Sequence, residues 1–402
     1  MPLYFLRRQF YNYFQEFLHD SRAIGVMLFV CTVISLVLSN LPFGETYAGF
    51  FTYEIHFFEV LHLPHSLVHW INDGLMALFF FLVGMEIKRE LTVGELSSVK
   101  RAILPIAAAI GGMVVPAVFY LGFNHNSPYE GGWGIPMATD IAFSLGVASM
   151  LGKKVPVNLK IFLTALAIID DLGAILVIAL FYGEGIQAFF LLGAALIFGI
   201  IWILNRKQVP FGKFHILLGL LLWYLVFNSG IHATIAGVLF AFMVPQDRLS
   251  ELEHKLHNYV NFGILPIFAL ANTAIVIQLS MIPELTGLLS MGIIVGLFAG
   301  KPVGIMLASW LMVKTKVAEL PRGVGWFQMA GAGILAGIGF TMSIFITCLA
   351  FSDVEIQDIG KIAILLAAIA SIIAAVVWFY ATAKYSKAQR KLIPKQEPSP
   401  LE

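Results

Sequence analysis

The sequence has few charged residues and almost no cysteine. Only 12% of its 402 residues are Asp, Glu, Lys or Arg, whereas 59% are hydrophobic. A soluble protein normally has about a quarter charged residues, so this composition excludes a polar, water-exposed surface around the whole chain. The net charge of +1 gives no indication of nucleic-acid binding. Cys31 and Cys348 both lie inside apolar runs, so neither a disulfide framework nor a cysteine-based metal site is indicated.

Long apolar runs dominate the sequence instead. Runs of about 20 residues recur along it, and each is long enough to cross the roughly 30 Å hydrocarbon core of a bilayer as a helix. They predict an all-α membrane protein with twelve transmembrane helices. The expected spans are 24–42, 69–87, 103–123, 131–150, 159–182, 188–204, 214–227, 230–244, 259–279, 289–312, 326–350 and 362–383.

The distribution of basic residues tests this count. With a cytoplasmic N-terminus, 23 of the 25 Lys and Arg residues fall in cytoplasmic segments, and the exceptions are Lys361 in an outer loop and Lys301 inside a span. Such an asymmetry is what the positive-inside rule requires. Both termini are therefore expected in the cytoplasm.

Three segments lie outside the expected spans or join them. Residues 1–23 mix aromatic and charged residues and are expected to form an amphipathic segment on the cytoplasmic membrane surface. Residues 384–402 are expected to form a disordered cytoplasmic tail. The longest outer loop, 43–68, contains "FFTYEIHFF", which favours either a small hairpin whose edge pairs with a second copy or an irregular loop.

Ionisable residues inside the spans are the strongest functional signal. Asp140, Asp170, Asp171 and Lys301 lie near span centres, whereas Asp73 and Glu86 lie nearer the ends of the second span. Such residues are costly in a membrane and usually functional. Adjacent residues of a helix point about 100° apart, so one of the paired aspartates can bind a ligand while the other pairs elsewhere, with Lys301 as the obvious partner.

Glycine and proline interrupt two of the spans. The fourth reads "GGWGIPMATDIAFSLG" and the eleventh "GAGILAGIGFTMSIF", which predicts two broken helices around a site or cavity. Two groups of three spans correspond: spans three to five, about 103–182, and spans ten to twelve, about 289–383. They are offset by seven crossings, and because seven is odd, corresponding spans cross the membrane in opposite directions. Each unit opens with a Gly/Pro element, "IGGMVVPA" or "FAGKPVGI". This arrangement is typical of inverted-topology repeats.

Several long motifs together resemble those of NhaA-type sodium/proton antiporters. They are "FFLVGMEIKREL", "ATDIAF", "KIFLTALAIIDDLGAI", "GKPVGI" and "GIGFTMSIF", and the resemblance covers residues 24–383 as a single twelve-span transport domain. It implies two interrupted helices, the fourth and eleventh spans, that cross near the membrane midplane. It also implies a multi-pass protein of the bacterial inner membrane, a homodimer, and no cofactor besides the transported ions.

The same resemblance implies roles for particular residues. Asp171 would be the principal carboxylate for cation and proton, with Asp170, Thr139 and Asp140 lining the site. Asp140 would offset the partial positive charge of two helix N-termini, and Lys301 the partial negative charge of two C-termini. The pH-responsive region would contain residues of "MEIKREL" and "ELEHKLHN": Glu86, Arg89, Glu90, Glu253, His254 and His257.

The implied activity is exchange of cytoplasmic Na⁺ or Li⁺ for external H⁺. Protons and the cation would compete for the buried aspartates during alternating access. The resemblance implies that the exchange is pH-regulated and, because two titrating groups allow more than one proton to move per cation, electrogenic. The residues alone leave three alternatives: a proton-coupled symporter of an organic solute, an intramembrane aspartyl protease, and a channel. The symporter would need a larger, more polar pocket, and the protease two aspartates that converge from different helices.

Overall fold

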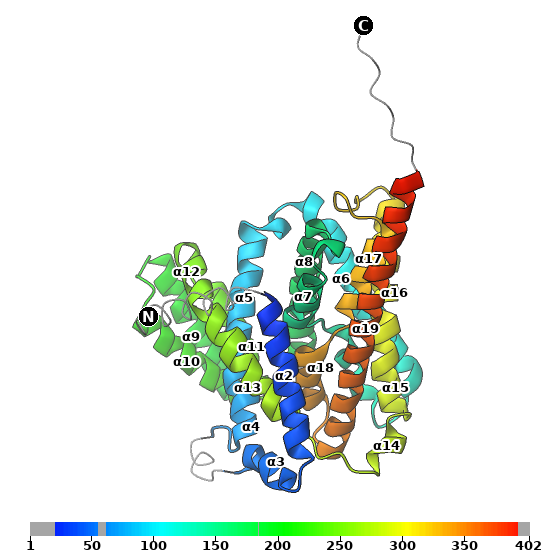
Figure 1. Ribbon diagram of the computed structural model, residues 1–402. Helices are drawn as coiled ribbons and strands as arrows, with labels where there is room; N and C mark the ends of the chain where they lie inside the picture. Colours follow the sequence, from blue (N-terminus) through cyan, green and yellow to red (C-terminus); the bar gives the residue numbers. More distant parts are fainter. Residues whose placement is uncertain (1–20, 55–61, 184, 393–402) are drawn as a thin grey trace, which may run out of the picture.

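The computed structural model describes residues 21–54, 62–183 and 185–392, and every regular element in these ranges is a helix. The longer helices lie side by side in a bundle (Figure 1). Their bounds are α2 Ser21–Ser39, α3 Gly44–Thr52, α5 Met76–Thr92, α6 Val99–Asn124, α7 Ile141–Met150, α8 Val157–Phe181, α9 Ala188–Arg206, α10 Lys213–Phe227, α11 Thr234–Met243, α12 Gln246–Tyr259, α13 Leu265–Asn272, α15 Leu288–Val295, α16 Lys301–Lys314, α17 Trp326–Ala336, α18 Phe340–Ala350 and α19 Val354–Leu392.

Seven helical segments within the described ranges are long and apolar enough to cross a membrane. They are Arg22–Ser39, Leu67–Thr92, Val99–Asn124, Val157–Phe181, Ala188–Arg206, Leu288–Lys314 and Val354–Ala383. The pair α17 and α18 passes the same test together, with a bend of 44° between them, and α10 and α11 are shorter apolar helices. The chain is therefore an all-helical, multi-pass membrane protein.

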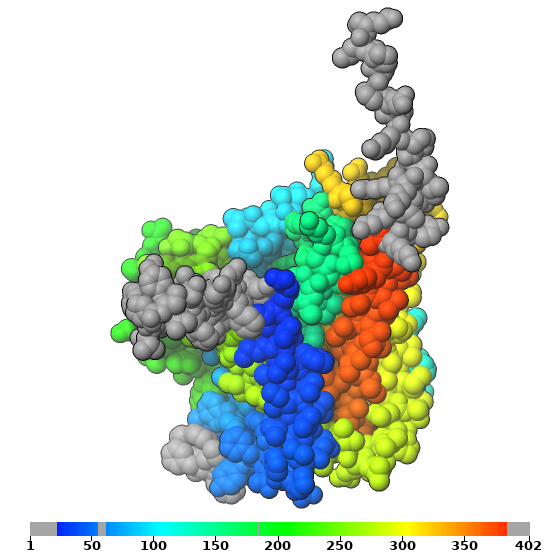
Figure 2. Space-filling view, in the orientation of Figure 1, coloured from blue at the N-terminus to red at the C-terminus, as the bar shows by residue number. Residues whose placement is uncertain are grey.

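The outer surface of the bundle suits a lipid environment. Figure 2 shows α2 at the surface of the molecule on this face. Large apolar side chains of α2, among them Phe29, Val33 and Val37, are exposed. The inner side of the same helix packs closely on α7, where a Cβ added at Gly25 would lie 3.3 Å from the Cα of Gly146. A small residue therefore lets α2 lie against α7.

Small residues also bring α6 and α16 together. A Cβ added at Gly304 would lie 2.0 Å from the carbonyl oxygen of Gly111, and one added at Gly111 would lie 2.4 Å from that of Gly304. Glycine at both positions permits this close approach, as small residues do in many membrane helix pairs. The two Gly/Pro elements noted in the sequence are therefore in direct contact, and this contact positions the N-terminus of α16, where Lys301 lies.

Two chain segments are broken near the centre of the bundle. The 3₁₀ helix η4, Glu130–Met137, is followed by non-helical residues 138–140 and then by α7. The Tyr182 hydroxyl lies 3.1 Å from the Gly134 nitrogen and 2.9 Å from the Gly131 carbonyl oxygen, so it bridges this tight segment. The second break, 337–339, separates α17 from α18.

Three π-helical segments distort long helices at sites that pattern analysis does not predict. They are η2 Trp70–Leu75 before α5, η6 Val260–Ile264 between α12 and α13, and η7 Gly296–Gly300 before α16. Such segments leave the regular hydrogen-bond register and are frequent at functional sites. Asp73 lies on η2, and Lys301 immediately follows η7.

The first outer loop, for which a small hairpin and an irregular loop were both left open, is described only in part. Residues 50–52 of "FFTYEIHFF" belong to α3, and an isolated antiparallel bridge joins Glu54 to Ser66. Residues 55–61 lie outside the described ranges, as do residues 1–20 of the predicted amphipathic segment.

The ninth predicted span, 259–279, ends earlier in the structure. Its helix stops at Asn272. The chain that follows is non-helical and is bound by the side chain of Asn40. The Asn40 Nδ2 donates to Ile275 O at 2.9 Å, and the Asn40 Oδ1 accepts from Ile277 N at 2.9 Å. The β-branched residues of this segment also disfavour a helix.

Near the C-terminus, helix α19 continues to Leu392, although the sequence predicted a disordered tail from residue 384. The stretch "KYSKAQRKL", 384–392, contains good helix formers and no Gly or Pro before Pro394. Residues 393–402 of the predicted disordered tail lie outside the described ranges.

Candidate functional site

Asp140 joins the two breaks. It is the N-cap residue of α7, and its Oδ1 accepts from Phe143 N at 2.9 Å. Its Oδ2 accepts from Thr341 N at 3.0 Å and from the Thr341 hydroxyl at 2.6 Å, in the first turn of α18. A carboxylate that caps two helix N-termini interacts favourably with the partial positive charge of both. Both oxygens of Asp140 are therefore engaged by these helix ends.

The chain around Asp140 is tied to the other break through its main chain as well. Asp140 N donates to Ile338 O at 2.8 Å, and the Ser343 hydroxyl on α18 donates to Ile135 O on η4 at 2.8 Å. Main-chain groups near each break are thus hydrogen-bonded across to the other, which lowers the cost of non-helical backbone inside a membrane.

Asp170 and Lys301 form a fully buried ion pair. Asp170 Oδ2 lies 2.9 Å from Lys301 Nζ, and both side chains have 0% exposure. Lys301 Nζ also donates to the carbonyl of Met137, the last residue of η4. A cation at a helix C-terminus is favourable, and the carboxylate compensates its buried charge. The sequence suggested that Lys301 pairs with one of the two adjacent aspartates, and in the structure that partner is Asp170.

Thr139 connects this ion pair to the second break. Its hydroxyl lies 2.8 Å from Asp170 Oδ2 and 3.1 Å from Ala336 O, the last carbonyl of α17. The hydroxyl has one proton and can donate to only one of these acceptors at a time. The C-terminal carbonyls of η4 and α17 therefore meet Lys301 and Thr139, respectively.

Asp171 has a different environment from its neighbour. It is 2% exposed, and its Oδ1 is buried without a hydrogen-bond partner. No residue in the described ranges donates a hydrogen bond to its carboxylate or pairs with it. One of the two adjacent aspartates is consequently fixed by a lysine, and the other is available to a ligand.

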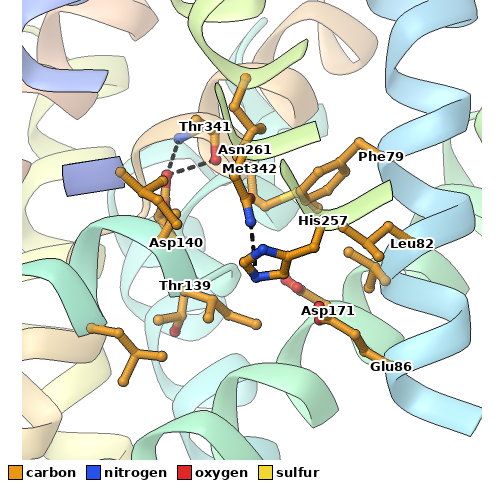
Figure 3. Close-up of a pocket in the computed structure, with 16 residues that line it drawn as sticks. Phe79, Leu82, Glu86, Thr139, Asp140, Asp171, His257, Asn261, Thr341 and Met342 are labelled. Atoms are coloured by element: carbon orange, nitrogen blue, oxygen red, sulfur yellow. Dashed lines mark hydrogen bonds between the residues drawn. The ribbon is translucent and has the colours of Figure 1, made fainter. Parts of the chain in front are cut away.

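Asp171 lines a cavity of about 130 Å³. Figure 3 shows Asp171, Glu86 and His257 on one side and Asp140 with Thr341 on the other. The lining includes three carboxylic acids and no Lys or Arg. The full set is Ile24, Phe79, Leu82, Val83, Glu86, Thr139, Asp140, Ile141, Ala142, Leu145, Asp171, His257, Asn261, Leu265, Thr341 and Met342. This acidic lining favours small cations over anions.

A second charged group lies at the junction of α5 and α12. Arg89 is paired with Glu90, at 3.2 Å, and with Glu253, at 3.0 Å. Burial raises the pKa of the Glu253 carboxyl above its usual value, although the Arg89 guanidinium opposes this shift. Glu90 Oε2 accepts from Glu95 N at 2.9 Å. The pair between Arg89 and Glu253 therefore connects the end of α5 to α12.

The predicted pH-responsive residues fall into separate places. Arg89, Glu90 and Glu253 form the ion-paired group, whereas Glu86 and His257 line the cavity with Asp171. His254 is exposed on α12. Their role in a pH response stays a prediction.

Two polar residues of the cavity were not predicted as site residues. The sequence indicated Thr341 only as part of a glycine-rich interruption. Its hydrogen-bond partner Asp140 lies 201 positions away, so the sequence contained no sign of their contact. Asn261 lies four residues after His257 and therefore on the same helix face, but that spacing alone does not indicate which face meets the cavity.

Comparison with known proteins identifies the family. The sequence matches the family model described as Na+/H+ antiporter 1 over residues 15–379. The chain belongs to this Na⁺/H⁺ antiporter family. Among its relatives, the protein named Na(+)/H(+) antiporter NhaA of Cytophaga hutchinsonii is 46% identical over 377 residues, covering 92% of this chain and 96% of the relative.

Two further relatives agree. Na(+)/H(+) antiporter NhaA 2 of Flavobacterium johnsoniae is 48% identical over 382 residues, covering 93% of each chain. Na(+)/H(+) antiporter NhaA of Tolumonas auensis is 50% identical over 345 residues, covering 84% of this chain and 87% of the relative. Members of this antiporter family are transporters and not enzymes, which removes the aspartyl protease alternative.

Proposed function

We propose that this antiporter exchanges cytoplasmic Na⁺ or Li⁺ for external H⁺ at Asp171. The observation that carries the proposal is the carboxylate of Asp171, which lacks a partner among the described residues and faces a cavity whose lining includes three carboxylic acids and no Lys or Arg. A small hard cation prefers oxygen ligands, and the Asp171 carboxylate supplies them. Family membership and the names of the relatives support the choice of ions.

Competition is the coupling mechanism. Asp171 binds a proton or takes part in binding a cation, because the carboxylate must lose its proton before it can bind the metal ion. If only occupied forms reorient across the membrane, each cation that leaves is exchanged for protons that enter. No further coupling device is needed.

Asp170 is the second member of the cation and proton site. Its Oδ2 is engaged by Lys301 and by the hydroxyl of Thr139, while its Oδ1 has no partner. When a cation binds Asp171, rearrangement of this ion pair supplies a second carboxylate. Because Asp170 and Asp171 are two titrating groups, more than one proton can bind in place of each cation. Movement of more than one proton per cation makes the exchange electrogenic, and about 2.3 kcal/mol per 100 mV is then available for each net charge.

Alternating access takes place around the two breaks. Twelve segments would span the membrane, with inverted repeats at about 103–182 and 289–383 and the broken fourth and eleventh segments crossing near the midplane. The hydrogen bonds between η4 and α18 and between Asp140 and Thr341 support this arrangement. Asp140 compensates the helix N-termini, and Lys301 compensates the C-termini.

The pH-regulated region comprises two neighbouring groups. Glu86 and His257 face the cation's cavity. Arg89 holds α5 to α12 through Glu253 and also pairs with Glu90 of its own helix, and His254 lies on the same helix as Glu253. Protonation changes within either group would alter the charge at the cavity or the connection between these helices. This arrangement supports activation over a limited pH range.

The transport domain comprises residues 24–383 in the bacterial inner membrane, with both termini in the cytoplasm and two copies forming a homodimer. The excess of Lys and Arg in alternate loops supports the orientation. No cofactor takes part, since the ions are the substrates.

The test uses purified protein reconstituted into vesicles that carry a pH-sensitive dye. A Na⁺ gradient should drive proton movement in the opposite direction, more strongly when membrane voltage aids it, over a limited pH range. Li⁺ should replace Na⁺, whereas K⁺ should not. Vesicles in which a Na⁺ gradient moves no protons at any pH would refute the proposed function.

A further inference from the structure

Helix α5 has two faces with different contacts. The face toward the cavity bears four lining residues at helical spacing: Phe79, Leu82, Val83 and Glu86. Figure 3 shows Phe79, Leu82 and Glu86 projecting from this helix toward the other residues of the cavity. Glu86 is the last of the four along the chain and the only one with a carboxyl group.

The other face of α5 packs on α11. It bears a second row at the same spacing: Ala77, Phe81, Gly84 and Lys88. A Cβ added at Gly237 would lie 2.2 Å from Ala77 O, and one added at Gly84 would lie 2.7 Å from the Cβ of Ala241. The two helices therefore approach closely along this row, and Lys88 continues it by one turn, near the C-terminal end of α5.

Lys88 binds the C-terminal end of α11. Its Nζ donates to the carbonyls of Phe242, at 2.8 Å, and Val244. The last carbonyls of a helix have no partner within the helix, and a cation near them is favourable. The Asn205 side chain of α9 donates to the carbonyl of Met243, between these two. The end of α11 is thus held by side chains from both α5 and α9.

Lys88 and Arg89 hold the end of α5 from different sides. Arg89 pairs with Glu253 of α12 at 3.0 Å, whereas Lys88 binds α11. Adjacent residues of a helix point about 100° apart, so the two attachments together fix the rotation of this end of α5. Glu86 precedes Lys88 by two positions, about 200° around the helix. Glu86 consequently faces the cavity because Lys88 faces α11.

We propose that Lys88 is a positioning residue for cation entry, and that its attachment to α11 holds the Glu86 carboxyl in the wall of the cavity that Asp171 also lines. Lys88 does not itself line this cavity, so it acts through Glu86. A carboxyl in the wall increases the local concentration of cations. This inference rests on the proposed Na⁺/H⁺ exchange and adds a positioning residue to it.

The experiment measures the apparent KM for Na⁺ and the maximal rate in reconstituted vesicles, at one pH at which the wild type exchanges. Lys88→Met keeps a long side chain but removes the ammonium group. It should raise KM about five-fold and change the maximal rate by less than about two-fold. Loss of a positive charge would by itself favour a nearby cation and lower KM, so the direction of the change separates positioning from direct electrostatics.

Two further substitutions of the same residue grade the effect. Lys88→Arg keeps the positive charge and can donate to both carbonyls, so its KM should stay near that of the wild type. Lys88→Gln keeps an amide donor on a shorter side chain, and its KM should lie between those of the wild type and Lys88→Met. It also keeps the test available if Lys88→Met does not fold, since a KM at or below the wild-type value would contradict the proposal equally.

Asn205→Ala is the matched control for stability. It removes a hydrogen bond from the same end of α11 without altering a contact of α5, so it should lower the melting temperature and leave KM unchanged. A double-mutant cycle tests the route of the effect. Glu86→Gln should raise KM, and adding Lys88→Met to it should raise KM no further, because Lys88 acts through the Glu86 carboxyl.

The outcomes are distinct. An unchanged or lowered KM for Lys88→Met would overturn the proposal while leaving Na⁺/H⁺ exchange intact. Equal increases in KM for Lys88→Met and Asn205→Ala would assign the effect to the stability of α11, and multiplying effects of Lys88→Met and Glu86→Gln would show that Lys88 does not act through Glu86. Absence of Na⁺-driven proton movement in the wild type would instead refute the proposed function itself.

Discussion

The carboxylate of Asp140 and the hydroxyl of Thr341 are 2.6 Å apart, although 201 residues separate them in the chain. The same carboxylate oxygen also accepts from Thr341 N. One aspartate thus closes both breaks, and the first turn of α18 is held to the residue that begins α7. The strength of this connection can be measured by removing the hydroxyl group of Thr341.

Thr341→Val should destabilise the folded protein by about 2 kcal/mol, because a hydrogen bond to a charged group contributes more than a neutral one. Thr347→Val is the matched control, since Thr347 is buried on the same helix and donates only to the neutral carbonyl of Ser343, at 2.8 Å. Thr347→Val should reduce the free energy of unfolding by about 1 kcal/mol. Thermal unfolding in detergent compares the two, and equal losses would show that the bond to Asp140 has no special strength.

Asp170 and Asp171 should respond differently to the same substitution. Asp171→Asn removes no hydrogen bond or ion pair that the described residues make, so the melting temperature should change little while transport is abolished. Asp170→Asn leaves Lys301 buried without its carboxylate, which should destabilise the protein by about 3–5 kcal/mol. Exchange in everted vesicles and thermal unfolding give the two readouts. Wild-type exchange by Asp171→Asn would disprove the proposed mechanism.

Lys301→Ala should reduce thermal stability more than cation specificity. The lysine caps η4 and pairs with Asp170, so its loss leaves a buried carboxylate without compensation, at a cost of about 3–5 kcal/mol. Adding Asp170→Asn should recover part of this loss, because the unpaired charge is then removed. A melting temperature of Lys301→Ala equal to that of the wild type would show that the ion pair has no structural role. So would a loss of stability in the double variant equal to the sum of the losses in the two single variants.

Glu253 should make stability depend on pH. Burial raises its pKa in the folded protein above the ordinary value of about 4.3, so the folded state binds the proton more tightly. Its stabilising contribution is complete below the ordinary pKa and is lost as pH rises through the raised one. Glu253→Gln cannot ionise, so its melting temperature relative to wild type should increase as pH rises through this window.

Glu251→Gln is the control for this prediction, on the same helix. Lys255 and Arg248 hydrogen-bond to Glu251 and lower its pKa, so its contribution is present above the ordinary pKa and is lost as pH falls through the lowered one. The melting temperature of Glu251→Gln relative to wild type should therefore decrease slightly as pH rises. Parallel pH profiles for the two variants would contradict both assignments.

Much of the architecture could be predicted because membrane burial imposes simple rules. Apolar runs and the placement of Lys and Arg predict where helices cross, and the charges at their centres indicate the site. The angle between adjacent helix residues also predicts that Asp170 and Asp171 differ. Which of them pairs with Lys301 depends on how α8 is rotated toward α16. Only the resemblance to a family indicated that Asp171 binds the cation and that Asp170 pairs with Lys301.

Local distortions could not be predicted in the same way. Each of the π-helical segments η2, η6 and η7 contains glycine, a poor helix former, but glycine alone does not predict a π-helical turn, whose register depends on the neighbouring helices that it contacts. The early end of α13 depends on Asn40, more than 230 positions away. The contact of Asn261 with the cavity likewise depends on the packing of η6, which periodicity alone does not give.

Gly304→Ala tests whether the crossing of α6 and α16 positions the site. The added methyl carbon would lie 2.0 Å from Gly111 O, so the helices must separate, at an expected cost of about 1–3 kcal/mol. Because α16 begins with Lys301, exchange should fall together with the melting temperature. Gly199→Ala on α9, where nothing lies within 4 Å of the added carbon, should leave transport unchanged and stabilise the helix by up to about 1 kcal/mol. Equal behaviour of the two variants would show that close contact at Gly304 does not hold α16 in place.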